Sequence, residues 1–249
     1  MLKTALSFSS EKAWDIEWET LSVSQVLNEP PLSKLNDIDR KFHKTFLYLK
    51  TFPEDSDYVL KLKRPIFKEE EITEEISIGQ FMLTAKLLGK KYPSHVILSQ
   101  GFLPGEIVQV WFETKKGKEK SPIFEIQPHP NVEEIPGSSI KLAAELVSPL
   151  YYFINFEGFE ENEILEITSF SWDERLNNEI KYQKKMGLGF SPAVIDKDRG
   201  IARLKVKRKK GGDSLTLVLP WGQSLMQYLT EEGRPIQEKF TPIKGDIQG

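Results

Sequence analysis

An internal repeat is the sequence feature that most constrains the fold of this chain. Residues 96–110, VILSQGFLPGEIVQV, and residues 153–167, FINFEGFEENEILEI, are identical at five of 15 positions at an offset of 57. A gapped match extends the similarity upstream, from FMLTAKLL at residues 81–88 to IKLAAELV at residues 140–147. Two related units in succession indicate duplication of one module, and chance similarity between β-strand patterns is the competing interpretation.

Apolar and polar residues alternate with a period of two in and beyond these units, which predicts β-strands. The alternating segments are residues 107–113, 164–170, 201–207 and 215–219. Gly211-Gly212-Asp213 separates the last two segments, as the turn of a hairpin requires. Turns are also predicted at Pro104-Gly105 and at residues 196–200. Short strands with frequent turns are typical of β-sandwiches.

The first 57 residues differ from the repeat region. Apolar residues at helical spacing predict a helix over residues 32–49, with Ser33 as its cap. The run Phe46–Leu49 also has strand propensity, so a strand is the alternative there. Residues 58–62 predict a strand. The five glutamates among residues 69–75 indicate a solvated loop, sheet edge or linker.

Residues 101–108, GFLPGEIV, carry a family resemblance. The segment resembles the G-[LF]-x-P-G-E-x-V segment of bacterial immunoglobulin-like modules, where it connects two core strands. The resemblance implies that Gly101 permits a bend, that Phe102 closes the end of the sandwich, and that Gly105 takes a positive φ in a tight turn. The second copy has Glu160-Glu161-Asn162 in place of Leu103-Pro104-Gly105, which departs from the motif.

The expected fold is mainly β, with tandem immunoglobulin-like antiparallel β-sandwiches and a distinct N-terminal segment. The expected divisions are residues 1–57 for the N-terminal segment, partly helical, 58–138 for the first module, 139–230 for the second, and 231–249 for an extended tail. A period near 57 is short for a complete seven-stranded sandwich. The two copies are therefore either separate domains or halves of one larger sandwich.

Composition excludes several kinds of site and partner. The chain has no cysteine, which excludes disulfides, thiol nucleophiles and zinc sites built on thiolates. Its formal net charge of −3 argues against a nucleic-acid partner. No apolar run reaches the roughly 18 to 20 residues that span a bilayer, so no transmembrane segment is predicted.

Motifs for bond chemistry are missing from the sequence. No serine lies in G-x-S-x-G, no glycine-rich phosphate motif opens a predicted helix, and the three histidines lack metal-ligand spacing. We therefore predict no catalytic residue, no cofactor and no metal site. Gly187-Leu188-Gly189 is interpreted as a loop. A carboxylate pair brought together by folding stays open as an enzymatic alternative.

Two groups of residues are candidates for binding a partner. Arg203, Lys205 and Lys207 share one face of a predicted strand, where they either meet phosphates or anionic headgroups or form a solvated outer face. Trp14 and Trp18, four residues apart, either share a helix face or dock as an arm on another subunit. An exposed aromatic platform would suit carbohydrate, whereas buried strand-end tryptophans are the more common arrangement.

The function predicted from these features is a non-catalytic binding or structural protein of the bacterial cell envelope. It would recognise a protein or surface partner through strand edges and loops. A carbohydrate-active enzyme or its accessory carbohydrate-binding domain is one alternative, and an intracellular effector or chaperone-like partner protein is another. The predicted location is the periplasm or cell surface if a leader was removed before Met1, and otherwise the cytoplasm.

Overall fold

The computed structural model describes residues 14–21, 44–51, 58–67, 71–76, 94–98, 102–116 and 119–228. Four parts of the sequence predictions lie outside these residues: most of the predicted helix, residues 32–43, the upstream repeat segment at 81–88, the bend at Gly101, and the extended tail at 231–249. The described chain forms two compact units. The first comprises residues 1–100 and 107–129, and the second comprises residues 101–106 and 130–249.

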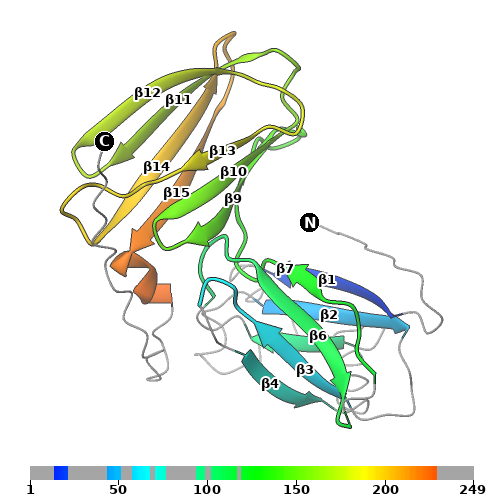
Figure 1. Ribbon diagram of the computed structural model, residues 1–249. Helices are drawn as coiled ribbons and strands as arrows, with labels where there is room; N and C mark the ends of the chain where they lie inside the picture. Colours follow the sequence, from blue (N-terminus) through cyan, green and yellow to red (C-terminus); the bar gives the residue numbers. More distant parts are fainter. Residues whose placement is uncertain are drawn as a thin grey trace. The chain divides into compact units, whose positions relative to one another are not determined.

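The first unit is a sandwich of a three-stranded and a four-stranded sheet (Figure 1). Sheet A has the order β1-β2-β5, with bounds Asp15–Leu21, Lys44–Thr51 and Ser94–Leu98. Sheet B has the order β4-β3-β6-β7, with bounds Glu71–Ile76, Tyr58–Lys63, Val108–Thr114 and Phe124–Ile126. All its strand pairs are antiparallel. The predicted strands at 58–62 and 107–113 are confirmed, and the glutamate-rich segment supplies the edge strand β4.

The N-terminal segment is part of this first sandwich, which corrects the division at residue 57. Its strands β1 and β2 pair with each other, and β2 also pairs with β5. Residues 44–49 are strand, so the helix predicted there is wrong and the strand alternative holds. Tertiary pairing outweighs the helical spacing of Phe46, whose ring is buried in the sheet interior.

The second unit is a sandwich of two four-stranded sheets (Figure 1). Sheet C has the order β13-β10-β9-β8, with bounds Gly187–Phe190, Tyr151–Glu157, Lys141–Ser148 and Asn131–Glu134. Sheet D has the order β12-β11-β14-β15, with bounds Glu174–Lys181, Ile164–Ser171, Arg199–Arg208 and Ser214–Gly222. A short 3-10 helix, η3 (Gln223–Tyr228), follows β15. All strand pairs are again antiparallel.

The alternating segments form the core of the second unit as the sequence predicts. Ala202, Leu204 and Val206 of β14 are buried between exposed neighbours. The hairpin between β14 and β15 turns at Gly211 and Gly212, which both have positive φ. Because every second residue of β14 is apolar, one face of this strand packs inward and the other faces solvent.

Gly187-Leu188-Gly189 is a strand, β13, and not the predicted loop. The strand pairs with β10, and the aromatic rings of β10 lie over the two glycines: the ideal Cβ position of Gly187 is 2.0 Å from a ring carbon of Phe153, and that of Gly189 is 1.8 Å from the Tyr151 hydroxyl. The glycines are therefore explained by cross-strand packing of aromatic rings at a sheet edge.

The two copies of the repeat have the same turn geometry. In each, the glutamate N–H donates to the carbonyl three residues earlier at 3.0 Å, from Glu106 to Leu103 and from Glu163 to Glu160. In each, the glutamate Oε2 also accepts from that earlier residue's N–H, at 2.9 and 3.1 Å. The two segments therefore share one local turn geometry.

The residue before the glutamate has a positive φ in both copies, 81° at Gly105 and 65° at Asn162. Asparagine tolerates the left-handed region better than most residues, so the second copy keeps the turn without Pro-Gly. The positive φ predicted at Gly105 is confirmed.

Gly158 is expected to be less replaceable than Gly137, another glycine of the second unit with a positive φ. Its φ is 78°, and a Cβ there would lie 2.2 Å from the Ser139 carbonyl oxygen. Gly137 has a similar φ of 75° with nothing within 4 Å of a Cβ. Gly137→Ala should cost about 1 to 2 kcal/mol for the left-handed backbone alone. Gly158→Ala should cost clearly more in urea unfolding, and equal costs would contradict the close approach at Gly158.

Candidate binding surface

The three cations predicted on one strand face lie there in the structure. Arg203, Lys205 and Lys207 of β14 are exposed and alternate with buried apolar residues. No ion pair joins any of these three to another described residue. In contrast, the next basic residues, Arg208, Lys209 and Lys210, are each paired with glutamates. The charges of Arg203, Lys205 and Lys207 are thus available to a partner.

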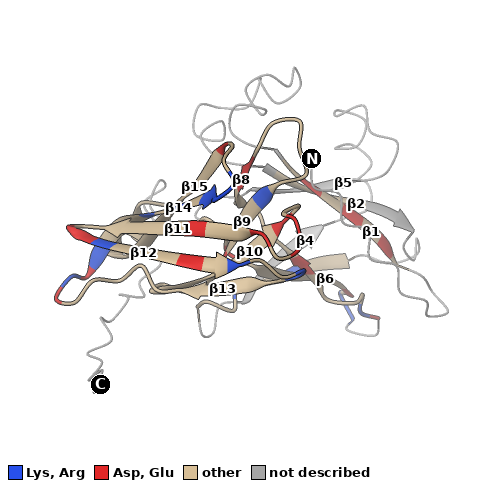
Figure 2. Cartoon of the chain, turned by 90° about the horizontal axis from the view of Figure 1, so that it is seen from above, with Lys and Arg blue, Asp and Glu red and all other residues tan. Residues whose placement is uncertain are grey.

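The strand register identifies which residues flank these cations in sheet D, whose charged residues are coloured in Figure 2. Arg203 lies between Phe170 of β11 and Val218 of β15, and Lys205 lies between Thr168 and Thr216. Lys207 lies between Glu166 and Ser214. The next strand, β12, adds Arg175, Asn177 and Glu179. We call this set of residues on β12, β11, β14 and β15 the basic face.

Apolar side chains are exposed at one end of the basic face. Phe170 is 38% exposed and Val218 is 46% exposed. The guanidinium of Arg175 lies over the Phe170 ring, 5.1 Å from its centroid. Sequence reasoning identified the cations but missed Phe170 and Val218, because only the pairing of β14 with β11 and β15 brings them beside Arg203. A face that combines cations with exposed apolar groups is suited to contact with an anionic partner.

The tryptophans predicted as partner contacts lie on or beside a strand and not on a helix. Trp14 is buried in the core of the first unit, stacked on Phe112 at 5.8 Å and edge-on to Tyr58 at 5.2 Å. Trp18 lies in β1 and is half-buried. Trp14 therefore has a packing role and is not exposed to a partner.

Trp172 is the exposed tryptophan of the second unit. It lies in the turn between β11 and β12 with a φ of 53° and is 57% exposed. Its indole Nε1 donates to the carbonyl of Arg199 at 2.8 Å, and the Lys197 ammonium lies 4.8 Å from its ring centroid. These contacts fix the ring against the loop that precedes β14.

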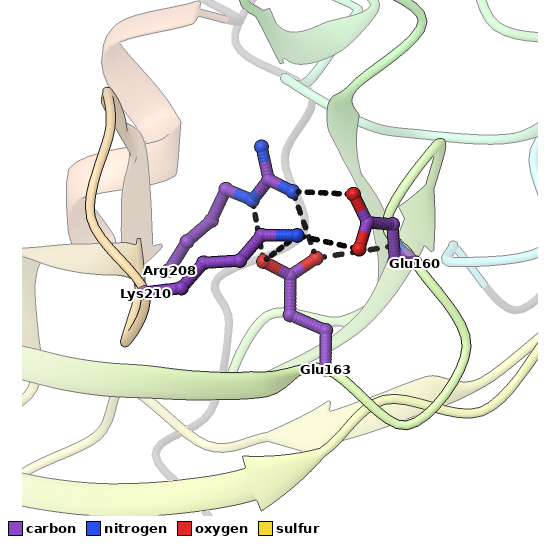
Figure 3. Close-up of polar contacts among 4 residues, drawn as sticks. All are labelled: Glu160, Glu163, Arg208 and Lys210. Atoms are coloured by element: carbon purple, nitrogen blue, oxygen red, sulfur yellow. Dashed lines mark hydrogen bonds and ion pairs between the residues drawn. The ribbon is translucent and has the colours of Figure 1, made fainter.

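A second cluster of charged groups lies between the turn at residues 160–163 and the end of β14 (Figure 3). Arg208 on β14 contacts both Glu163 and Glu160, and Lys210 contacts the same two carboxylates. The Glu163 side chain is 3% exposed and the Arg208 side chain 19%. The ion pairs of this cluster therefore connect the turn at residues 160–163 to the end of β14.

The chemistry of this cluster favours a structural role. Burial opposes ionisation of Glu163, but hydrogen bonds from Arg208 and the Glu160 backbone, with the charges of Arg208 and Lys210, hold its pKa below the usual value. The hydrogen bond to Glu163 raises the pKa of Arg208. A general acid needs a raised carboxyl pKa, which is the opposite shift. An open depression borders the cluster, lined by residues 160–164 with Lys209 and Lys210.

The stability of the second unit should fall in acid because of Glu163. Its folded pKa lies below the reference value of 4.5. Its ionised form therefore adds stability that is present above pH 4.5 and lost as the pH falls through the folded pKa. Urea unfolding of Glu163→Gln should show a weaker pH dependence below pH 4.5 than the parent chain. The exposed control Glu174→Gln should keep the parent slope; equal slopes for Glu163→Gln and the parent would contradict this role.

Tyr151 and Phe153 form a pair of exposed rings on the outer side of sheet C. They are adjacent outward positions of β10, and both rings lie across β13 over its two glycines. The spacing of Tyr151 and Phe153 does not by itself predict this arrangement, because the glycines under the two rings lie more than 30 residues later in the sequence. Flat exposed rings are able to stack on sugars.

No group of histidine, aspartate and glutamate side chains that could hold a metal ion occurs in the described part of the chain. Within the same residues, no helix is long and apolar enough to cross a membrane.

Comparisons with known proteins give no family for this chain. No family model matches the sequence, and no curated protein matches it. Among solved structures, the chain is similar to a two fibronectin type-III domain segment from chicken tenascin, with 11% identity, a TM-score of 0.26, and coverage of 71% of this chain and 91% of that one.

A second similar structure contains domains FN1–FN3 of chicken CNTN1. It shares 11% identity at a TM-score of 0.26, with coverage of 72% of this chain and 62% of that chain. The sheets themselves show that the chain is mainly β, built of antiparallel sandwiches.

Proposed function

We propose that the chain is a non-catalytic binding protein of the bacterial cell envelope that recognises its partner through the basic face. The observation that carries the proposal is the row Arg203, Lys205 and Lys207, exposed on a rigid sheet and without ion pairs among the described residues. Sites built on strands hold their side chains in fixed relative positions, which favours recognition. The envelope location rests on the resemblance of residues 101–108 to bacterial immunoglobulin-like modules.

Co-sedimentation with isolated bacterial cell envelopes tests this function. The parent chain should pellet with the envelopes at low salt, and the triple variant Arg203→Ser/Lys205→Ser/Lys207→Ser should stay in the supernatant. The variant Lys184→Ser/Lys185→Ser removes two exposed lysines elsewhere in the second unit and should pellet like the parent. If the triple variant pellets like the parent chain, the proposal is contradicted. It is also contradicted if the chain degrades an envelope polymer and a point substitution abolishes that activity.

A carbohydrate-binding role through sheet C is the second candidate, favoured by the rings of Tyr151 and Phe153 over Gly187 and Gly189. It predicts a different result in the same co-sedimentation assay. Tyr151→Ala/Phe153→Ala should then abolish envelope binding, while the triple variant of the basic face should leave it intact. The two variants therefore assign binding to one sheet or the other.

A further inference from the structure

We infer that the partner of the basic face is an anionic polysaccharide. This inference rests on the proposed function and adds the chemical class of the partner. It follows from the charge of the face, from the uncharged groups that lie between the charges, and from the spacing of the cations along β14.

The charge of the basic face is opposite in sign to that of the whole chain, whose formal net charge is −3. Arg203, Lys205 and Lys207 lie on β14, and Arg175 lies two strands away in the row of Arg203. Two carboxylates share the face. Glu179 is engaged by Lys209, with contacts at 2.8 and 2.9 Å, and Glu166 lies opposite Lys207 in the register. The residues directly across from Arg203 and Lys205 on β11 and β15 carry no acid, and a partner with regularly placed negative charges complements these two cations.

The uncharged groups of the face match a sugar polymer. Thr168 donates to Asn177 at 3.0 Å, and Thr216 lies on the other side of Lys205, so hydroxyl and amide groups flank the cation. Such groups hydrogen-bond to sugar hydroxyls as donors or acceptors. The exposed ring of Phe170 and the methyl groups of Val218 provide an apolar surface for the C–H face of a sugar ring.

The geometry of the face favours a linear chain. Alternate residues of a strand are about 6.6 to 6.8 Å apart, so the three cations of β14 cover about 13 Å. An extended polyanion can contact all of them at once. Membrane binding would require apolar groups that enter the bilayer by several ångströms, whereas Phe170 and Val218 are strand residues in the same sheet as the cations.

Titration calorimetry with an octamer of galacturonate tests the inference, with the fully methyl-esterified octamer as the uncharged probe. The whole chain should bind the acidic octamer, with an affinity that falls as salt is raised. The triple variant should bind roughly thirty-fold more weakly, since each exposed ion pair contributes about three-fold. Lys184→Ser/Lys185→Ser should match the parent within about two-fold. Phe170→Leu should weaken binding and leave the salt dependence unchanged.

Several outcomes would overturn the inference. These are no binding of the acidic octamer, equal binding of the esterified octamer, or equal binding by the folded triple variant. Vesicles of 7:3 phosphatidylcholine and phosphatidylglycerol form a parallel arm. If they bind through the basic face and the octamer does not, the partner is an anionic membrane and the polysaccharide inference fails. The proposed function would survive that result, because envelope co-sedimentation would still depend on the basic face.

Discussion

Replacing Trp221 by alanine is expected to destabilise the second unit by about 3 to 5 kcal/mol, the usual cost of removing a fully buried large aromatic side chain. Trp221 lies in β15 and has no exposed surface. Its indole N–H donates to Ser171 Oγ at 3.2 Å, and Ser171 in turn donates to the carbonyl of Pro192. The substitution therefore removes packing and leaves this hydrogen-bonded pair incomplete.

The Trp221 ring also explains why residue 200, on the neighbouring strand β14, is glycine. Gly200 is paired with Trp221, and a Cβ at Gly200 would lie 2.7 Å from two atoms of the indole. With no side chain at Gly200, the cavity left by Trp221→Ala cannot be filled from that side. A large cavity that does not collapse is the case with the highest cost.

Hydrogen exchange measured by mass spectrometry provides the readout, because it reports the opening of β14 and β15 separately from the first unit. Trp172→Ala is the matched control, since Trp172 is more than half exposed. It should cost less than about 1 kcal/mol, mainly for its hydrogen bond to Arg199. If the two variants are equally stable, Trp221 is not the centre of this core.

Replacing Arg208 by methionine is the second substitution expected to have a large effect. It leaves Glu163 buried with Lys210 at 3.5 Å as its remaining cation. Removing one partner of a buried ion pair costs more than the pair itself contributes, because the other charge stays desolvated. Arg208 is partly exposed, so we expect a loss of about 2 to 4 kcal/mol at pH 7, somewhat below the range for fully buried pairs.

Two controls separate this effect from a general loss of charge on β14. Arg203→Met removes an exposed cation from the same strand and should change the stability by no more than about 0.5 kcal/mol. The double variant Glu163→Leu/Arg208→Met removes both charges and should recover much of the loss, because no buried carboxylate is then left with a weaker partner. A double variant that is no more stable than Arg208→Met would show that the cost is one of packing.

The second sandwich is the part of the fold that the sequence specifies most clearly. In β14 and β15 each inward residue is apolar and the turn is glycine-rich, so local and tertiary preferences agree. The repeated turn was also readable, because its positive-φ residue and its glutamate recur at the same offset. Asn162 is the informative case: the Pro-Gly motif is lost there, but the backbone requirement that Gly105 meets is kept.

In the N-terminal region, the local sequence does not specify the secondary structure. The apolar residues around Phe46 fit a helix as well as a strand, and only the partners β1 and β5 decide between them. The packing of Trp14 could not be predicted either, because nothing in the local sequence shows that Phe112, almost 100 residues away, stacks on its ring.

Only part of the basic face could be predicted from the sequence. Alternation placed Arg203, Lys205 and Lys207 together, since residues two apart share a face of any strand. Phe170 and Val218 join them through cross-strand register, which composition and spacing do not reveal. The ion pair between Glu163 and Arg208 could not be predicted in this way, because its two members lie 45 residues apart and only the fold brings them together.

Nuclear magnetic resonance mapping of the acidic octamer on the isotope-labelled chain is the most direct test of the central claim, that the outer side of sheet D is the recognition surface. We expect the largest amide shift changes on β14 and its neighbours, at Lys205, Thr168 and Thr216, with small changes elsewhere. Changes centred on Tyr151 and Phe153 of β10, or on the turn of Glu160 and Glu163, would contradict the claim and place recognition on another surface.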